Sequence, residues 1–223
     1  MNEITIQSFE HFHKQIQTYD RKKDIYRGVR KKKYALIPKI GRVRFPTGTS
    51  REREEELMLE WFKERAVPYF DFNLRDEWES IAVAQHHGLP TRLLDWTRNP
   101  LVATFFAVEE KYVGDSAVYV LKGYEVISDE EMMSFTPFTY PKVGKYAPPH
   151  ITERIAAQAA VFTIHPEPEI AFSSDSVDKL IIPHSLRNKL KKMLDTYGIN
   201  RAALFPGLDG LASHITWLRT KSH

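Results

Sequence analysis

The chain has 223 residues, a formal net charge of +3 and no cysteine. Because 42% of its residues are hydrophobic and 12% aromatic, the composition is that of a folded protein and excludes an intrinsically disordered chain. No apolar run approaches the roughly 20 residues that span a bilayer, and without cysteine there are no disulfides or thiolate metal sites. We therefore expect a cytoplasmic protein that makes no contact with a membrane and forms a single domain over residues 1–223.

Helices are predicted to dominate the N-terminal half. A helix is expected over residues 7–19, and a brief strand at Ile25–Gly28. A second helix opens with a capping box at Thr49–Glu52, in which Thr49 caps the free amides, and ends at Pro68.

A third helix and a buried fourth one surround the most polar segment. The third is expected over residues 76–87 and stops at Gly88 in the left-handed conformation. Residues 93–96 read as extended, after which Asn99-Pro100 predicts the start of a helix over 101–110. This helix is almost entirely apolar, so we expect it to be buried.

Strands are predicted mainly beyond residue 115, at 117–121, 160–164 and 180–182, with a long structured loop at 135–149. A helix capped by Ser185 should run to Tyr197, and Asp209 should cap a last helix whose Leu211, Ile215 and Leu218 face inward. This order favours an α+β fold, in which a helix-rich N-terminal half packs on a mixed or antiparallel sheet.

Positive charge is concentrated in residues 21–44. The segment has one acid, Asp24, and these bases: Arg21, Lys22, Lys23, Arg27, Arg30, Lys31, Lys32, Lys33, Lys39, Arg42 and Arg44. Such a cluster can bind the phosphates of a nucleotide or nucleic acid, and a solvated basic face is the plainer alternative. Arg27 differs from the rest because it lies between Tyr26 and Gly28 at an expected strand end.

The densest chemistry lies in the sequence Gln-His-His-Gly-Leu-Pro-Thr-Arg-Leu-Leu-Asp-Trp-Thr-Arg-Asn-Pro of residues 85–100. A purely structural connection needs a glycine, a proline and a cap, so the extra charged and aromatic residues indicate a bound ligand. Asp95 fits a general base, a ribose-binding acid or a buried partner of Arg92 or Arg27. Trp96 fits either stacking on a flat ring or packing in the core.

Other features leave the kind of chemistry open. His86 and His87 are adjacent, so on a helix they point about 100° apart and cannot bind one metal ion together; we predict no metal site. The sequence has no phosphate-binding glycine loop, zinc-protease helix or serine elbow. Gln158, surrounded by small residues, fits a ligand contact or the satisfaction of a backbone group.

Three separated motifs together resemble the FRG domain family, named after an aromatic-Arg-Gly triplet. They are Tyr26-Arg27-Gly28, the block from Gln85 to Thr97 with the following Asn99-Pro100, and the segment from Arg154 to Ile164 that contains Gln158. The order of these parts is also similar to that of the ADP-ribosyltransferases, which implies a related core with NAD as the substrate.

This second resemblance implies a role for each site residue. Arg27 would hold the phosphates or ribose of NAD, and His86, Arg92, Asp95 and Trp96 would line the nicotinamide-ribose pocket. Gln158 would occupy the place of the usual glutamate, where its neutral amide can hold a hydroxyl group but offers no charge, so Asp95 is the alternative carboxylate. The predicted set comprises catalytic Arg27, His86, Asp95 and Gln158, and NAD-binding Tyr26, Arg27, Gly28, Thr91, Arg92, Trp96 and Thr97.

The leading hypothesis is an NAD-binding FRG domain that acts as an ADP-ribosyltransferase-like toxin or defence effector. Its target would be a protein or a nucleic acid, the latter contacted through basic residues 21–44. One alternative is a non-catalytic module that binds a nucleotide or nucleic acid through the same segment. Another is a hydrolase with His86 or His87 as the base, which no accompanying nucleophile or metal set supports.

Overall fold

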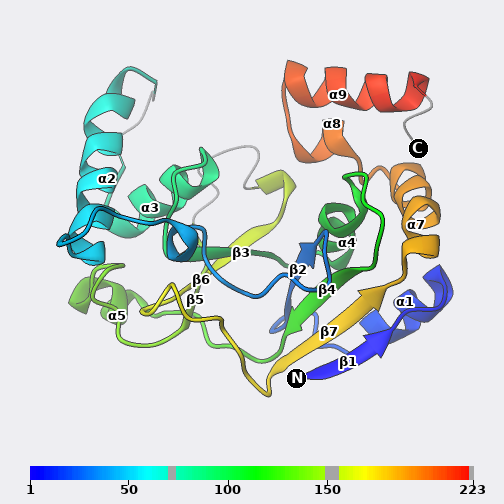
Figure 1. Cartoon of the computed structure of the whole chain (residues 1–223), viewed down its shortest axis with the longest axis horizontal. Coiled ribbons are helices and arrows are strands. Elements are labelled where there is room, and N and C mark those ends of the chain that lie inside the picture. Colours follow the sequence, from blue (N-terminus) through cyan, green and yellow to red (C-terminus); the bar gives the residue numbers. More distant parts are fainter. Residues whose placement is uncertain (70–73, 149–155, 221–223) are drawn as a thin grey trace.

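The computed structural model describes residues 1–69, 74–148 and 156–220 (Figure 1). Its centre is a seven-stranded sheet in the order β1-β7-β4-β2-β3-β6-β5. Only β1 and β7 are parallel, and the other neighbours are antiparallel. The strands are β1 (Asn2–Thr5), β2 (Ile25–Val29), β3 (Leu93–Thr97), β4 (Ser116–Leu121), β5 (Gly144–Tyr146), β6 (Ala160–Ile164) and β7 (Val177–Ile182).

Together with the sheet, the helices confirm the expected α+β class. No helix in the described part of the chain is long and apolar enough to cross a membrane. Short 3₁₀ turns lie at Ile40–Arg42 and Val67–Tyr69. The α-helices are α1 (Phe9–Ile16), α2 (Arg51–Ala66), α3 (Glu77–His86), α4 (Pro100–Val108), α5 (Asp129–Ser134), α7 (His184–Thr196), α8 (Arg201–Leu204) and α9 (Leu208–Arg219).

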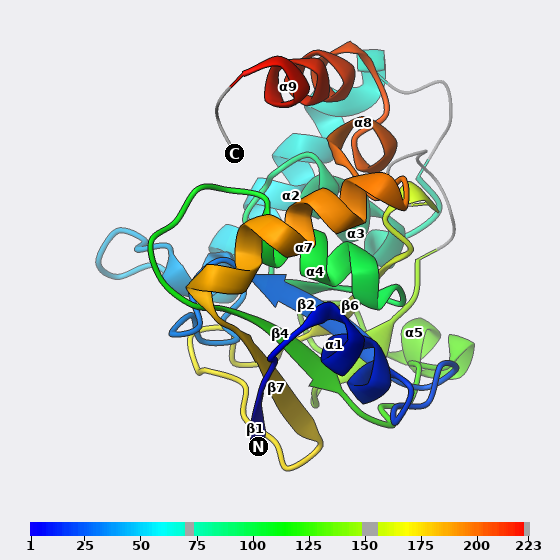
Figure 2. The ribbon, with the colours of Figure 1, turned by 90° about the vertical axis from the view of Figure 1, so that its right-hand side faces the viewer.

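Two groups of helices cover one face of the sheet. Helices α1, α4 and α7 pack on β2, β4 and β7, as Figure 2 shows, and α4 is largely buried, as its sequence predicts. Helices α2 and α3 pack on β3, β5 and β6. Tyr26 of β2 packs with the first group and lies directly opposite Thr97 of β3. Thr97 is on the same side of β3 as Leu93, which packs with the second group. The space between α3 and α4 therefore lies over the junction of β2 and β3.

The sheet opens at that junction. All five residues of β2 pair with β4, and all five of β3 pair with β6, but β2 and β3 share only the pair Tyr26 and Thr97. The later part of β2 and the earlier part of β3 thus have facing edges that do not pair. Backbone groups at such edges need other partners, which a side chain, water or a ligand can supply.

Gly28 explains why β2 stays with α4. A Cβ atom at this position would lie 1.7 Å from the backbone oxygen of Ala103 in α4. Only glycine allows the strand and the helix to approach so closely. The glycine of the aromatic-Arg-Gly triplet is therefore a packing residue, and it fixes the position of the neighbouring Arg27 backbone relative to α4.

The sequence located most elements but missed some of their ends. Gly88 has the expected positive φ of 95°, and Asn99 caps α4 by accepting from the amide of Leu101. The predicted capping box is wrong: α2 begins after Ser50, which makes no side-chain cap, and the hydroxyl of Thr49 donates to the oxygen of Pro46. Helix α7 begins one residue before Ser185, after Pro183, and Gly207 precedes α9 in place of Asp209.

The inward-facing apolar stripe predicted for α9 is also wrong. Leu211, Ile215 and Leu218 are 46%, 50% and 50% exposed, and α9 lies at the edge of the molecule (Figure 1). The side that faces the body lies about 100° around the helix, because Gly210 packs against the backbone of Phe205 and His214 lies 3.4 Å from Asp195. The predicted loop at 135–149 contains β5, and the elements β1, α5 and α8 were not predicted.

The close approach of β2 and α4 is tested by Gly28→Ala. The added methyl group has no room against the backbone of Ala103, so we expect a loss of about 1–3 kcal/mol in unfolding free energy, measured by urea denaturation. An unchanged midpoint would show that the strand and helix can separate at no cost.

Candidate functional site

The opening between β2 and β3 is a cavity of about 510 Å³. Residues from β2, β3, the end of α3 and the start of β6 line it, together with groups from the basic segment. Its charged lining residues are four cations and two carboxylates: Arg27, Arg30, Lys39, Arg42, Asp95 and Glu110. The cavity is thus polar, with an excess of positive charge.

Arg27 and Asp95 face each other across the opening. Nη1 of Arg27 donates to the backbone oxygen of Asp95 at 2.6 Å and lies 3.4 Å from its carboxylate Oδ2. Burial lowers the pKa of the Arg27 guanidinium, and the Asp95 carboxylate opposes this effect. The side chain of Arg27 is 22% exposed and that of Asp95 is 56% exposed, so both charges remain accessible from the cavity.

Lys39 and Arg42 extend the positive region beyond Arg27. Nζ of Lys39 donates to the backbone oxygen of Gly88 at 2.6 Å. Arg42 forms no ion pair with any carboxylate of the described residues, and its charge further lowers the pKa of Arg27. Arg30 instead pairs with Glu110 at another part of the lining.

Tyr26 and Trp96 line the cavity while remaining almost fully buried, at 3% exposure each. Burial raises the pKa of Tyr26 to about 12, so its phenol stays protonated at neutral pH. The indole nitrogen of Trp96 donates to the hydroxyl of Thr163 at 2.9 Å, and this hydroxyl lies 2.8 Å from Nε2 of His165. Trp96 is therefore a core residue, held in one orientation, that also lines the cavity.

Thr97 and Gln158 close the cavity at the other end of β3. The hydroxyl of Thr97 donates to the backbone oxygen of Gln158 at 2.7 Å, and Nε2 of Gln158 donates to the backbone oxygen of Leu204 at 2.9 Å. The amide of Gln158 thus satisfies a backbone group while its residue lines the cavity. Arg154 and Ile155 of the same motif lie outside the described residues.

His86 and His87 serve different surroundings. Their rings contact each other edge to face with centroids 5.0 Å apart. His86 lines the cavity between β2 and β3, whereas His87 lines a second cavity. Of the two, His86 has the placement that the predicted role requires.

Thr91 and Arg92, both predicted to bind NAD, do not line the cavity. Arg92 is 1% exposed, and its guanidinium donates to Glu55 of α2 at 2.8 and 3.1 Å and to the backbone oxygen of Phe138 at 3.0 Å. Burial raises the pKa of Glu55, and the hydrogen bonds from Arg92 oppose it. Arg92 precedes β3 and joins it to α2, so its role is structural. Thr91 is 3% exposed and donates its hydroxyl to Gln85.

Several lining residues were not among those predicted: Arg30, Tyr34, Lys39, Arg42, Gln85 and Glu110. Most belong to the basic segment, residues 21–44. Its charge predicted phosphate binding but did not show which of its residues lie beside the Tyr26-Arg27-Gly28 motif. Gln85 belongs to the dense block. For Glu110, at the end of an apolar helix, the sequence has no signal.

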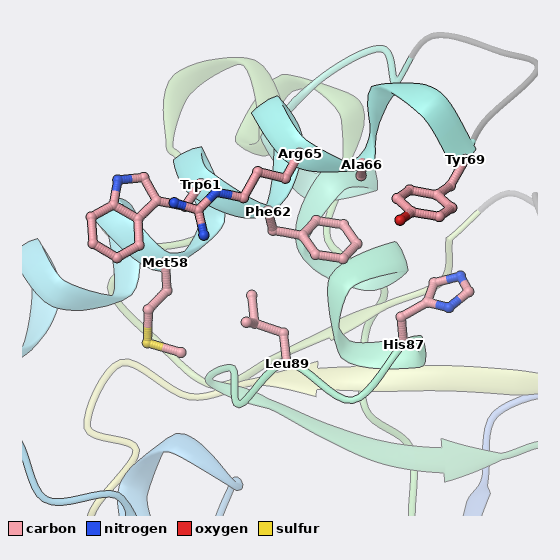
Figure 3. Close-up of a pocket in the computed structure, with 8 residues that line it drawn as sticks. All are labelled: Met58, Trp61, Phe62, Arg65, Ala66, Tyr69, His87 and Leu89. Carbon is pink, nitrogen blue, oxygen red and sulfur yellow. The ribbon is translucent and has the colours of Figure 1, made fainter.

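A second cavity, of about 550 Å³, lies between α2 and the loop after α3 (Figure 3). Its lining is mainly apolar and includes Met58, Phe62 and Leu89, with Trp61 and Arg65 stacked at one side. It has few groups to orient a polar ligand, and residues 70–73, which follow Tyr69 in its lining, lie outside the described chain. We therefore place the candidate site at the first cavity.

The structural role of Arg92 is tested by pairs of substitutions. Arg92→Met should lower the unfolding free energy by about 3–5 kcal/mol, because Glu55 stays buried without its partner. The double variant with Glu55→Leu should recover most of that loss. Urea denaturation measures both, and a double variant no more stable than Arg92→Met would contradict the pairing.

Because His165 is buried, we expect the unfolding free energy to fall at acidic pH. Burial, with a smaller effect from Arg27, lowers its pKa from 6.5 to about 4. As the pH falls from 6.5 to about 4, the unfolded state takes up a proton that the folded state does not, which removes about 3 kcal/mol of stability. His165→Gln, which cannot titrate, should lose correspondingly less between pH 7 and pH 4. Equal losses in the two proteins would contradict a neutral, buried imidazole.

Comparison with known proteins supports the family indicated by the motifs. Residues 22–116 match the family model of the FRG domain, a range that includes Arg27, His86 and Asp95 but not Gln158. Searches of curated proteins and of solved structures found no match. This match supports the FRG domain family for residues 22–116 of the chain.

Proposed function

We propose that the cavity between β2 and β3 binds NAD and that the protein transfers ADP-ribose to a protein or nucleic-acid target. The observation that carries this proposal is the convergence of Arg27, Asp95 and Gln158, which lie on separate motifs, around one cavity. Its volume of about 510 Å³ lies within the range of cofactor and ligand pockets.

The charges of the cavity suit the two kinds of groups in a dinucleotide. Arg27, Lys39 and Arg42 offer the positive charge that a diphosphate requires, and the planar guanidinium of Arg27 fits a bidentate phosphate contact. Asp95 lies next to this region and suits ribose hydroxyl groups, which donate hydrogen bonds. Trp96 and Tyr34, which both line the cavity, provide apolar surface for a ring.

The reaction requires charge stabilisation at the ribose. The bond between ribose C1′ and the nicotinamide nitrogen breaks, its electron pair leaves with nicotinamide, and positive charge develops on the ribose. The Asp95 carboxylate stabilises that charge. A nucleophile of the target then forms the new bond to C1′ and loses its proton, for which His86 is the candidate base. Gln158 contributes no charge and serves to hold a hydroxyl group.

The proposal extends to the biological role of a toxin or defence effector. This part rests on the resemblance to ADP-ribosyltransferases alone. Transfer of ADP-ribose consumes NAD and modifies a cellular target, and either effect harms a cell when it is not restrained.

A non-catalytic nucleotide- or nucleic-acid-binding module is the second candidate. One observation favours it: the Asp95 carboxylate is already engaged by Arg27 and by Gln85. The basic segment, however, does not act as a whole, because Arg30 pairs with Glu110 and Lys32 pairs with Asp115 at 2.7 Å. This module would bind with an affinity that falls steeply with salt and would form no product from NAD.

Variants of Arg27 and Asp95 distinguish the two candidate functions. Arg27→Ala should weaken NAD binding at least roughly tenfold, as removing a charged hydrogen-bonding partner does, and Asp95→Ala should abolish label transfer from NAD. Calorimetry measures binding, and labelled NAD with candidate targets measures transfer. Lys33→Ala is the matched control, because it removes one exposed cation of the same segment outside the cavity.

The two proposals fail in different ways. If the wild-type protein neither binds NAD nor transfers the label, the transferase proposal is excluded. If it binds a nucleotide or nucleic acid with a steep salt dependence and Asp95→Ala binds equally well, the non-catalytic module is the better account.

A further inference from the structure

We propose that Gln85 is a positioning residue which, with Thr91 behind it, fixes the Asp95 carboxylate so that its unused lone pairs accept the hydroxyl groups of a ribose. The identity of the ligand, a ribose, rests on the proposed function. The arrangement of the three side chains belongs to the protein without its ligand and can be tested separately.

A directional series of hydrogen bonds sets the amide of Gln85. The backbone amide of Leu93 donates to the hydroxyl oxygen of Thr91 at 3.1 Å, and this hydroxyl lies 2.8 Å from Oε1 of Gln85. Because Oε1 can only accept, Thr91 must donate to it. The NH₂ group of Gln85 then points the other way, to Oδ1 of Asp95 at 3.0 Å. Thr91 is 3% exposed, so little water competes for its hydroxyl.

The turn after α3 makes this series possible. Gln85 lies in the last turn of α3, and Gly88, with φ of 95°, reverses the chain. The segment that follows runs back beside the end of the helix and enters β3 at Leu93. Thr91 and Asp95 thereby contact the same glutamine from two positions of one short segment.

The carboxylate of Asp95 is held at both oxygens. Gln85 donates to Oδ1, and Nη1 of Arg27 lies 3.4 Å from Oδ2. A carboxylate has about four acceptor positions, and these two donors leave about two of them for a ligand. The side chain is 56% exposed, toward a cavity that it lines.

This geometry selects hydroxyl groups over phosphates at Asp95. The two hydroxyls of a ribose can each donate to an oxygen of the carboxylate, whereas a phosphate is repelled by it. Phosphates are instead directed to Arg27, Lys39 and Arg42 on the positive side of the cavity. A nucleotide would therefore bind with its ribose at Asp95 and its diphosphate at these cations.

The first test uses the ligand-free protein. NMR signals of the Gln85 side-chain amide and the Asp95 carboxyl carbon report their hydrogen bonding. Thr91→Val removes the hydroxyl and should shift both signals, whereas Thr91→Ser keeps the hydroxyl and should leave them close to those of the wild type. Gln85→Leu, at a half-buried position, should shift the Asp95 signal in the same way and covers the case in which Thr91→Val does not fold.

The second test uses NAD and inorganic pyrophosphate as probes. Thr91→Val and Gln85→Leu should each weaken NAD binding roughly fivefold to tenfold, as the loss of one hydrogen bond does, while pyrophosphate binding stays within twofold of the wild type. A merely structural role would weaken both ligands together.

The outcomes separate this inference from the proposed function. If the Asp95 signal is unchanged in both Thr91→Val and Gln85→Leu, or if both variants bind NAD as the wild type does, the positioning role is overturned. If the signals shift as expected but the wild type binds no NAD, the arrangement stands and the proposed function fails.

Discussion

The cavity exists because β2 and β3 separate after a single pair of residues. Each strand has a full partner on its outer side, β4 or β6, and the two share only the pair Tyr26 and Thr97. Gly28 keeps β2 against α4, while α3 lies over β3. If the strands continued to pair, the sheet would close and no cavity would exist. The facing edges are instead bridged by Arg27, which donates to the backbone oxygen of Asp95 at 2.6 Å.

The charges around the opening are held by the fold itself. Arg27 and Asp95 offset each other, so neither is left as an isolated charge when no ligand is bound. Trp96 donates to the hydroxyl of Thr163, which in turn contacts His165. Burial lowers the pKa of His165, so its imidazole is neutral at neutral pH. Arg92 and Glu55 form a separate buried pair that joins β3 to α2. Preorganised groups of this kind can act on a ligand without first rearranging.

Local signals in the sequence predicted most of the elements, because caps and turns are determined by a few neighbouring residues. Gly88 and Asn99-Pro100 lie where the chain reverses and where α4 begins. The motifs also indicated which segments meet, and Arg27, His86, Asp95 and Gln158 do line one cavity. What the sequence could not give is the partner of each charge. Arg92 and Asp95 lie in one short block, yet Arg92 pairs with Glu55 of α2, 37 residues away, whereas Asp95 lines the cavity. The orientation of α9 likewise follows from tertiary contacts, those of Gly210 with Phe205 and of His214 with Asp195.

The proposed nucleotide site depends on the missing strand pairs between β2 and β3 and on Gly28, Arg27 and Asp95. A crystal structure of the protein soaked with NAD shows whether a nucleotide occupies the gap between these strands. We expect electron density in that gap, with the diphosphate beside Arg27 and Arg42 and a ribose on Asp95. Density only in the apolar cavity beside Phe62 and Leu89, or an empty gap at saturating NAD, would contradict the account.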